Sequence, residues 1–256
     1  MTLICRVNRS RTIHVSLSAP MDIALRDRYD VDQSIVCGNA SVVAEPAPHP
    51  AQPDLSRISA GERDTSFVTI GHLSNLSVEK GLEDVYRTYE LLKADGVDVR
   101  MVVAGEAATQ RDLDVVEDAK CAHPEIVHLG RLRRDQLGLF FASIDVFLFP
   151  SRYSNEAEPL VVLEALANGV PVMATAIGYV PAISFPADWC FPLEADFARR
   201  AVQALTRVDA AGLSGLRDQA RRTFDLLNST SNSGYLELID ILSTVGVRTD
   251  TPSSDV

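Results

Sequence analysis

The sequence predicts an α/β protein built on a doubly wound parallel sheet, with helices at its C-terminal end. After residue 65, short continuous apolar segments alternate with segments whose apolar residues recur at helical spacing. Continuous apolar strands of this kind are typical of a parallel sheet covered by helices on both faces. A shorter strand–helix–strand pattern occupies residues 1–44, and a proline-rich segment, residues 45–64, separates the two.

The first pattern comprises a strand over 13–19, a helix over 21–29 and a strand over 34–40. Residues 13–19 alternate in polarity and are rich in strand formers. Pro20 stands where a helix tolerates proline in its first turn.

Four prolines then crowd into residues 45–54, where they can neither donate to a sheet nor sit inside a helix. We therefore expect a linker and domain boundary at 45–64.

The second pattern continues almost to the end of the chain and is Rossmann-like. We expect strands at residues 67–71, 99–106, 126–130, 145–151, 170–175 and 189–191. We expect helices at residues 79–94, 109–121, 135–142, 160–168, 197–207, 213–227 and 234–242. The main domain then spans 65–228, followed at 229–256 by a last helix and a frayed tail.

Composition narrows the class of protein. The 256 residues are 46% apolar and 23% charged, with a formal net charge of -11. This acidity argues against nucleic acid or an anionic membrane surface as a bulk partner. The four cysteines lack CxxC spacing, which favours free thiols in a reducing cytoplasm over zinc or disulfides. No apolar run is long enough for a membrane span, and the start is too short in apolar residues for a signal peptide.

The most informative segment runs from residue 149 to 175, FPSRYSNEAEPLVVLEALANGVPVMAT. Its strand ends at Pro150, and ligands bind at the carboxyl edge of such sheets. Glu156 follows in a polar loop, and Glu164 falls in the early turns of a helix opened by Pro159, so both carboxylates can face one cleft. Charged carboxylates accept hydrogen bonds from sugar hydroxyls. On spacing alone, a capped helix with solvent-facing glutamates is the commoner arrangement.

This segment resembles the E-x7-E signature of glycosyltransferase family four, followed by that family's G-x-P-V strand. The match holds at Glu156, Leu160, Glu164, Ala165, Gly169, Pro171 and Val172. Glu158 stands where the family usually has an aromatic residue. The resemblance implies the GT-B fold, transfer with retention of anomeric configuration, no metal and no cofactor beyond the nucleotide-sugar donor, UDP- or GDP-linked. It assigns the transferred sugar to Glu156 and the donor ribose to Glu164, and it groups Leu160 with the donor-binding residues.

A second segment, IGHLSNLSVEKG at 70–81, passes from a strand through a loop to a predicted helix start, where free N–H groups attract anions. Lys80 adds a charge suited to a diphosphate. The segment resembles the family's G-R-L…K-G, whose arginine and lysine clamp the diphosphate. His72 takes the arginine's place and lies farther from Lys80 than usual. We expect a bound diphosphate to raise the pKa of His72, so that it serves as a cation.

Three weaker positions complete the candidate site. Gly71 and Gly105 are expected to end strands, where glycine lets a donor approach the backbone, although plain turns fit equally well. Arg131 resembles a family residue that lies near the base or diphosphate. The alternative, commoner for arginine, is an exposed side chain in solvent. Ala182 replaces the glutamate of the family's G-G-x-P-E loop, so we assign no chemical role to that loop.

The resemblance implies that residues 1–44 are the remnant of an acceptor-side Rossmann domain and that 65–228 binds the nucleotide-sugar. The expected activity is sugar transfer to an unknown saccharide, lipid or small-molecule acceptor, in the cytoplasm or at the inner face of the membrane. One alternative is a non-catalytic or split-subunit donor-binding domain that meets a separate N-terminal chain. A weaker alternative is a related sugar-nucleotide epimerase, whose acid and base groups are not identifiable here.

Overall fold

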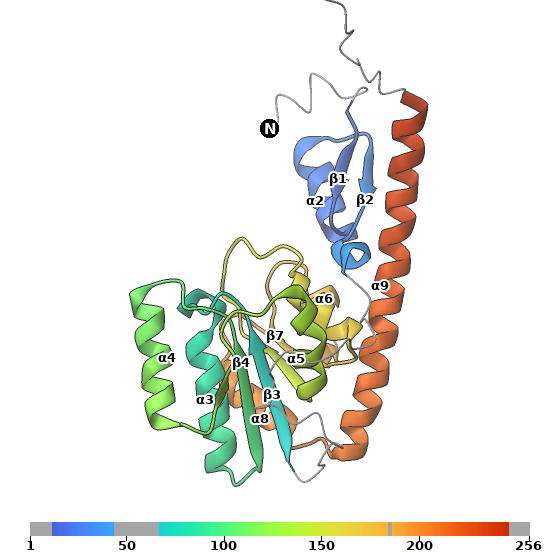
Figure 1. Cartoon of the computed structure of the whole chain (residues 1–256). Helices are drawn as coiled ribbons and strands as arrows, with labels where there is room; N and C mark the ends of the chain where they lie inside the picture. The colour runs from blue at the N-terminus through green and yellow to red at the C-terminus, as the bar shows by residue number, and fades with distance from the viewer. Residues whose placement is uncertain (1–11, 44–66, 184–185, 246–256) are drawn as a thin grey trace, which may run out of the picture. The chain divides into compact units, whose positions relative to one another are not determined.

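The computed structural model describes residues 12–43, 67–183 and 186–245 (Figure 1). The chain forms two compact units: residues 1–41 with 227–256, and residues 42–226. The predicted linker, 45–64, and the frayed end of the tail lie outside the described residues. The first unit thus joins the two ends of the chain, an association that the linear pattern does not reveal.

The larger unit contains a six-stranded parallel sheet in the order β5-β4-β3-β6-β7-β8. Its strands are β3 Val68–Leu73, β4 Val99–Ala104, β5 Val127–His128, β6 Val146–Phe149, β7 Val172–Thr175 and β8 Cys190–Phe191. The strand order reverses direction next to β3, as expected of a doubly wound sheet. This confirms the predicted fold class.

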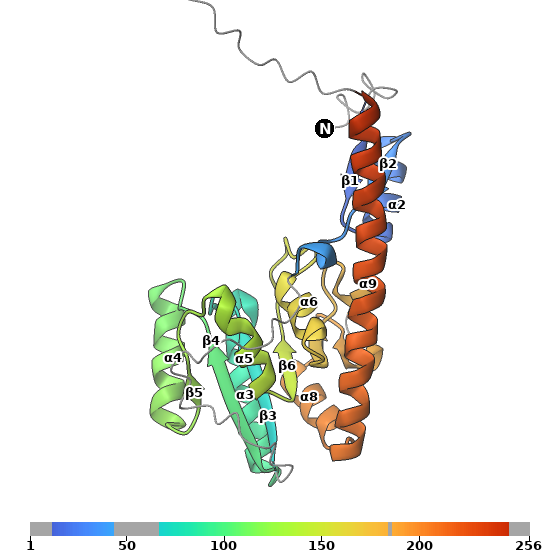
Figure 2. The ribbon, with the colours of Figure 1, turned by 45° about the vertical axis from the view of Figure 1, so that its right-hand side comes forward.

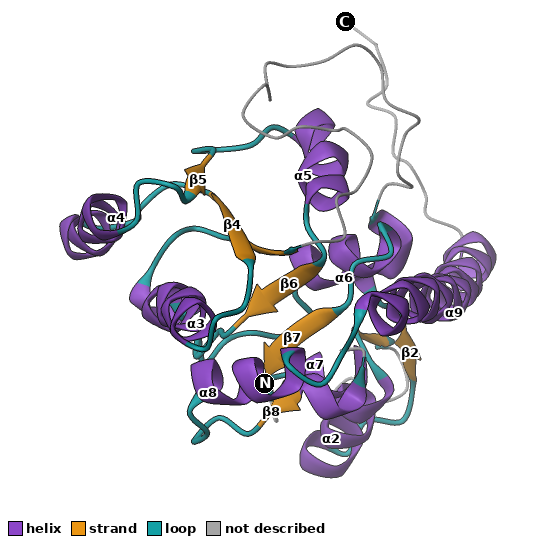
Figure 3. Cartoon of the chain, turned by 90° about the horizontal axis from the view of Figure 1, so that it is seen from below, coloured by secondary structure: helices purple, strands orange, loops and turns teal. Residues whose placement is uncertain are grey.

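Helices cover both faces of this sheet. They are α3 Leu82–Ala94, α4 Gln110–Ala122, α5 Leu137–Ser143, α6 Leu160–Ala167, α7 Val180–Ile183, α8 Phe197–Leu205 and the first part of α9 Ala210–Val245. Figure 3 shows α3 and α8 on one face of the sheet and α5 and α6 on the other. Short 3-10 turns precede α3, at Val78–Lys80, and α5, at Arg134–Gln136, and a third, Ala187–Trp189, precedes β8.

The core lies in the central strands. Every residue of β6 and β7 is buried, because helices cover both sides of these strands. Phe147 packs edge-to-face against Phe141 of α5, with ring centroids 5.8 Å apart. Burial of these apolar strands positions the loops that leave their carboxyl ends, where ligands bind in folds of this kind.

The smaller unit pairs β1 His14–Ser16 with β2 Ser34–Val36 in parallel, connected by α2 Ala19–Tyr29. A 3-10 turn, Asn39–Val42, follows β2. Against these strands lies the end of α9, where a Cβ on Gly234 would stand 1.9 Å from the Val36 carbonyl oxygen. The hydroxyl of Ser231 also donates to the Gly38 carbonyl. The absence of a side chain at residue 234 therefore allows the helix to dock on this unit.

The C-terminal helices differ from the prediction. Two helices, at 213–227 and 234–242, were expected, but α9 runs continuously from Ala210 to Val245 (Figure 2). The segment between them, residues 228–233 (NSTSNS), is polar and resembles a loop in sequence. Ser231 bonds to Gly38 and Ser41, and Gly234 packs against Val36; these contacts favour a helical path there and override local propensity.

Candidate functional site

Three loops that carry predicted site residues leave the same edge of the sheet. Lys80 follows β3, Gly105 follows β4 and Glu156 follows β6. Because all these strands are parallel, their carboxyl ends meet at one edge. The fold therefore brings together segments that are up to 76 residues apart in the sequence.

Lys80 ends a 3-10 turn rather than entering a helix. The helix expected from residue 79 begins at Leu82, because Gly81 adopts a left-handed conformation with φ 78° and interrupts it. A Cβ on Gly81 would stand 2.2 Å from the Pro150 carbonyl oxygen. Glycine here lets the Lys80 turn pack directly on the end of β6, which explains physically why lysine and glycine occur as neighbours.

Lys80 and Glu156 form an ion pair across the two loops. The Lys80 Nζ lies 2.5 Å from Glu156 Oε2, and the two side chains are only 24% and 11% exposed. The hydroxyl of Ser151 donates to the same carboxylate oxygen at 3.1 Å. The Tyr153 ring lies under the ammonium, 4.7 Å from Nζ to its centroid. Charge pairing and a ring face thus hold one cation at the sheet edge.

A further loop supports the Glu156 segment from behind. The Tyr179 N–H donates to the Ala157 carbonyl at 2.8 Å. Gly178, with φ 55°, lies so close that a Cβ would meet the Glu156 carbonyl oxygen at 2.1 Å. The sequence assigned this loop no chemistry, and these two contacts place it against the backbone of the candidate site.

Glu164 lies in the second turn of α6, within the early turns where the sequence predicted it. Its side chain is half-buried, and burial raises its pKa, while the positive charge of Arg134 acts in the opposite direction. Leu160, the first residue of α6, is exposed. Hydroxyl donors from a ligand would stabilise such a half-buried carboxylate, because they replace the hydrogen bonds to water that burial removes.

His72 occupies an interior position. Its Nδ1 lies 2.9 Å from the Leu148 carbonyl oxygen and its Nε2 lies 2.8 Å from the Ser74 hydroxyl. Because a carbonyl oxygen can only accept, Nδ1 carries a proton and donates it to Leu148. In a neutral ring, Nε2 is then the acceptor that faces the Ser74 hydroxyl. Burial lowers the pKa of His72 to about 4. A neutral, enclosed imidazole does not favour the expected role of a diphosphate-binding cation.

The two predicted glycines differ in their surroundings. Gly71 lies inside β3 rather than at its end, and a Cβ there would meet the Ile144 side chain at 2.6 Å. The missing side chain therefore lets Ile144, the residue after α5, pack directly on β3. Gly105 does follow a strand, with φ 127°, and a Cβ would stand 1.9 Å from the Ser74 carbonyl oxygen. Its N–H donates to the Gly130 carbonyl at 2.8 Å, next to exposed Arg131.

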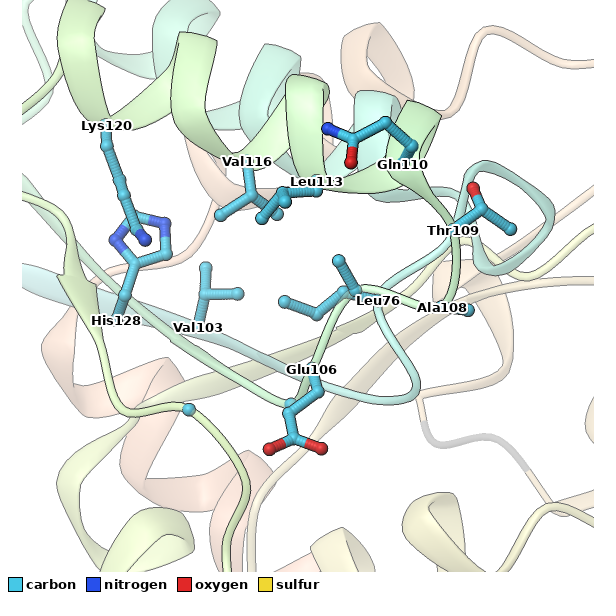
Figure 4. Close-up of a pocket in the computed structure, with 13 residues that line it drawn as sticks. Leu76, Val103, Glu106, Ala108, Thr109, Gln110, Leu113, Val116, Lys120 and His128 are labelled. Atoms are coloured by element: carbon cyan, nitrogen blue, oxygen red, sulfur yellow. The ribbon is translucent and has the colours of Figure 1, made fainter.

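A pocket of about 470 Å³ opens beside Gly105, between α4 and the ends of β4 and β5. Figure 4 shows Leu113 and Val116 of α4 facing Leu76 and Val103 across an apolar space, with Lys120 and His128 at one end. Its complete lining is Leu76, Val103, Gly105, Glu106, Ala107, Ala108, Thr109, Gln110, Leu113, Val116, Lys120, His128 and Gly130. Sequence patterns pointed only to Gly105.

Sequence reasoning also missed Asp112, which is buried at the start of α4 and bonds to the Lys80 turn. The detectable signal was the Thr109-x-x-Asp112 spacing of a capping box, which the structure contains. Its bond to a distant turn left no local signal.

Within residues 12–43, 67–183 and 186–245, no cluster of three or more His, Cys, Asp or Glu side chains is arranged to hold a metal ion. None of the helices in these ranges combines the length and apolar character that a membrane crossing requires. The cysteines at 37, 121 and 190 are free.

Comparison with curated proteins gives relatives that carry sugar-transfer names. The chain is 34% identical over 127 residues to sulfoquinovosyl transferase of Arabidopsis thaliana, covering 50% of this chain and 22% of that protein. It is 27% identical over 205 residues to the gpi3 subunit of phosphatidylinositol N-acetylglucosaminyltransferase of Schizosaccharomyces pombe, covering 75% and 43%. The chain therefore spans less than half the length of these relatives.

Solved structures share the fold. TarM of S. aureus, in a complex that includes UDP, superposes with a TM-score of 0.65 at 16% identity, covering 91% of this chain and 45% of that one. Sucrose-phosphate synthase of Thermosynechococcus elongatus gives a TM-score of 0.65 at 17% identity, covering 96% and 62%. Residues 57–199, more than half of the chain, match the family described as "Glycosyl transferases group 1". The chain belongs to the group 1 glycosyl transferases.

Proposed function

We propose that this chain provides the donor-binding part of a retaining glycosyltransferase of family four, which moves a sugar from a nucleoside diphosphate to an acceptor hydroxyl. The observation that carries the proposal is the Lys80–Glu156 ion pair, which joins the K-G turn to the E-x7-E loop at the carboxyl edge of the sheet. The family match and the sugar-transfer names of the relatives support it.

Lys80 is the proposed partner of the donor diphosphate. Its ammonium is the charged group held at this edge by the Glu156 carboxylate and the Tyr153 ring. When the bond from the sugar to the diphosphate breaks, negative charge grows on the leaving oxygen. A cation fixed before the reaction stabilises that charge without reorganisation, and such stabilisation usually lowers the barrier more than any other single effect.

Glu156 is the proposed contact of the transferred sugar, and Glu164 that of the ribose. Glu156 shares one oxygen with Lys80 and Ser151, so its carboxylate lies beside the proposed diphosphate site. Glu164 is half-buried with a raised pKa, and two neighbouring ribose hydroxyls would restore the hydrogen bonds that burial removes. Exposed Leu160 opens the same helix and offers apolar contact.

The base is proposed to lie toward the pocket beside Gly105, because that pocket opens at the same sheet edge and has apolar walls. Arg131, exposed next to Gly130, is the proposed polar contact at this end. A nucleotide would then run from the β4–β5 side of the edge to the Lys80 turn.

In the proposed reaction, the acceptor hydroxyl attacks the anomeric carbon from the face that the diphosphate leaves. The new glycosidic bond forms, the bond to the diphosphate breaks, and the hydroxyl proton leaves with the departing phosphate. The acceptor is a saccharide, lipid or small molecule, and its binding surface includes a partner N-terminal domain. The free cysteines fit a cytoplasmic protein, in solution or peripheral to the membrane.

A calorimetric panel of UDP, GDP and their glucose and mannose derivatives tests the donor site. We expect saturable binding of one nucleotide series by wild type, and weaker binding by Lys80→Ala and Glu164→Ala. Equal responses of wild type and both variants to every nucleotide would overturn the assignment.

The alternative is a non-catalytic or split-subunit donor-binding domain. It is distinguished by supplying an N-terminal domain and measuring release of nucleoside diphosphate from a bound donor. Transfer or hydrolysis supports the enzyme, whereas tight binding without either supports the alternative.

A further inference from the structure

Asp112 is a buried acid on the wall of the sheet edge, outside the set of residues that resemble the family signature. It is the third residue of α4 after the N-cap Thr109, and only 4% of its surface is exposed. A buried carboxylate is costly unless hydrogen bonds satisfy it. The hydrogen-bond partners of the Asp112 carboxylate therefore show how its burial is compensated.

One carboxylate oxygen of Asp112 completes an ordinary helix cap. Oδ2 accepts from the Thr109 N–H at 3.0 Å and from the Thr109 hydroxyl at 2.6 Å. In return, the Asp112 N–H donates to the Thr109 hydroxyl at 3.2 Å. These bonds form a capping box, and an uncharged glutamine can also serve in such a box.

The other oxygen reaches outside the helix. Oδ1 accepts from the Val78 N–H at 2.9 Å, a residue 34 positions earlier in the chain. Val78 opens the 3-10 turn that ends at Lys80. Burial alone raises the pKa of Asp112, but the bonds from Thr109 and Val78 outweigh it and lower the pKa, so the carboxylate is charged.

The loop before α4 also forms hydrogen bonds with Leu76, just before the Val78–Lys80 turn. The Leu76 N–H donates to the Glu106 carbonyl at 2.9 Å, and the Ala108 N–H donates to the Leu76 carbonyl at 3.2 Å. The Lys80 turn is thereby tied to the pocket wall at two successive points. Of these ties, the one from Asp112 is made by a side chain and acts directly on the turn.

We infer that Asp112 is a positioning residue of the donor site, which fixes the backbone of the Val78–Lys80 turn so that the lysine presents its ammonium to a nucleoside diphosphate. The inference rests on the function proposed for Lys80. An ordered turn restricts Lys80 before binding, whereas a mobile turn would have to become ordered when the diphosphate binds.

Substitutions at two positions separate positioning from helix capping. Asp112→Ala removes both the cap and the bond to Val78. Thr109→Ala weakens the cap but leaves Asp112 able to accept from Val78. Asp112→Asn conserves shape but offers one acceptor oxygen where the carboxylate offers two, so the bond from Val78 competes with those from Thr109 and the negative charge is lost. It replaces Asp112→Ala if the alanine variant fails to fold.

The binding experiment compares UDP with uridine, and GDP with guanosine, because only the diphosphates engage Lys80. We expect Asp112→Ala to weaken the diphosphate about two- to tenfold, the effect of ordering one long side chain on binding, and to leave the nucleoside unchanged. Thr109→Ala should change neither. In a Lys80→Ala background, Asp112→Ala should add no further loss.

Equal losses for Asp112→Ala and Thr109→Ala, or a matching loss of nucleoside affinity, would show a merely structural role. Amide hydrogen exchange of residues 74–81 provides a readout that needs no nucleotide. Faster exchange in Asp112→Ala than in Thr109→Ala supports the tie, and equal exchange overturns it. If wild type binds no nucleotide while exchange differs as expected, the proposed function fails and the tie to the turn stands.

Discussion

The end of β3 and the turn that follows it contain two of the candidate cations of the site, and their surroundings differ sharply. His72 lies inside the sheet, where both ring nitrogens bond to protein atoms and burial lowers its pKa to about 4. Lys80, eight residues later, ends a turn at the sheet edge and faces Glu156. A residue inside the strand, such as His72, is therefore held by the fold, whereas one in the turn after the strand, such as Lys80, can face a ligand.

The largest expected effect concerns His72 and stability in acid. Because the native pKa is about 4 and the unfolded value about 6.5, the unfolded chain binds a proton that the native chain refuses between these values. The contribution of neutral His72 to stability is fully present above pH 6.5. The free energy of unfolding then falls by about 3 kcal/mol as the pH drops to 4. Urea denaturation across this range should show a shallower loss for His72→Gln. Parallel curves for the two proteins would mean that His72 is not held neutral.

Lys80→Ala should show its main effect in nucleotide binding, whereas His72→Gln acts on stability. A hydrogen bond to a charged group contributes about 1.5–3 kcal/mol, so nucleoside diphosphate affinity should fall about ten- to hundredfold. Because the pair is mostly buried, loss of Lys80 also leaves the Glu156 carboxylate without its cation, so the thermal midpoint should fall as well. Lys93→Ala, a lysine exposed on α3, is the matched control for calorimetry. An equal loss in both variants would remove Lys80 from the site.

Glu164 extends the comparison to the carboxylates. Burial raises its pKa, and the charged form is the better acceptor for ribose hydroxyls. Nucleotide affinity should therefore decline as the pH falls through this raised pKa. Glu164→Gln should bind about three- to tenfold more weakly and lose that pH dependence. A nucleotide lacking the 2′ and 3′ hydroxyls should bind both proteins alike, and a persisting difference would place the ribose elsewhere.

Ser151→Ala should have the smallest effect. Its hydroxyl donates to Glu156 at 3.1 Å, but Lys80 continues to hold the same carboxylate. A stability loss of about 0.5–1.5 kcal/mol is expected, with diphosphate affinity changed by less than about threefold. A larger loss of affinity would show that Ser151, rather than Lys80, orients Glu156.

The alternation of buried strands and helices in the sequence predicted the fold class and most elements of the larger unit, because a parallel sheet covered on both faces imposes that pattern. The pattern was misleading where contacts override it. Ser231, in the loop-like stretch 228–233, and Gly234, directly after it, contact Gly38 and Val36, and this stretch is helical. Gly81 delays the helix after Lys80 because it packs on Pro150.

The candidate site was predictable where residues belong to local motifs, as Lys80 and Glu156 do. The partners that fix those residues come from other loops, and no single stretch of sequence contains them. Asp112 bonds to Val78 and Gly178 packs behind Glu156 only after the sheet has assembled. The burial of His72 likewise depends on its neighbouring strand, which supplies the Leu148 carbonyl.

The proposed function depends above all on whether the edge holding Lys80 and Glu156 binds a nucleoside diphosphate. A crystal structure of the chain grown with UDP or GDP would answer this directly. We expect a phosphate oxygen within hydrogen-bond distance of the Lys80 Nζ, ribose hydroxyls on Glu164, and His72 still bonded to Leu148 and Ser74. A nucleotide bound at another face, with the Lys80–Glu156 pair unchanged, would contradict the proposal.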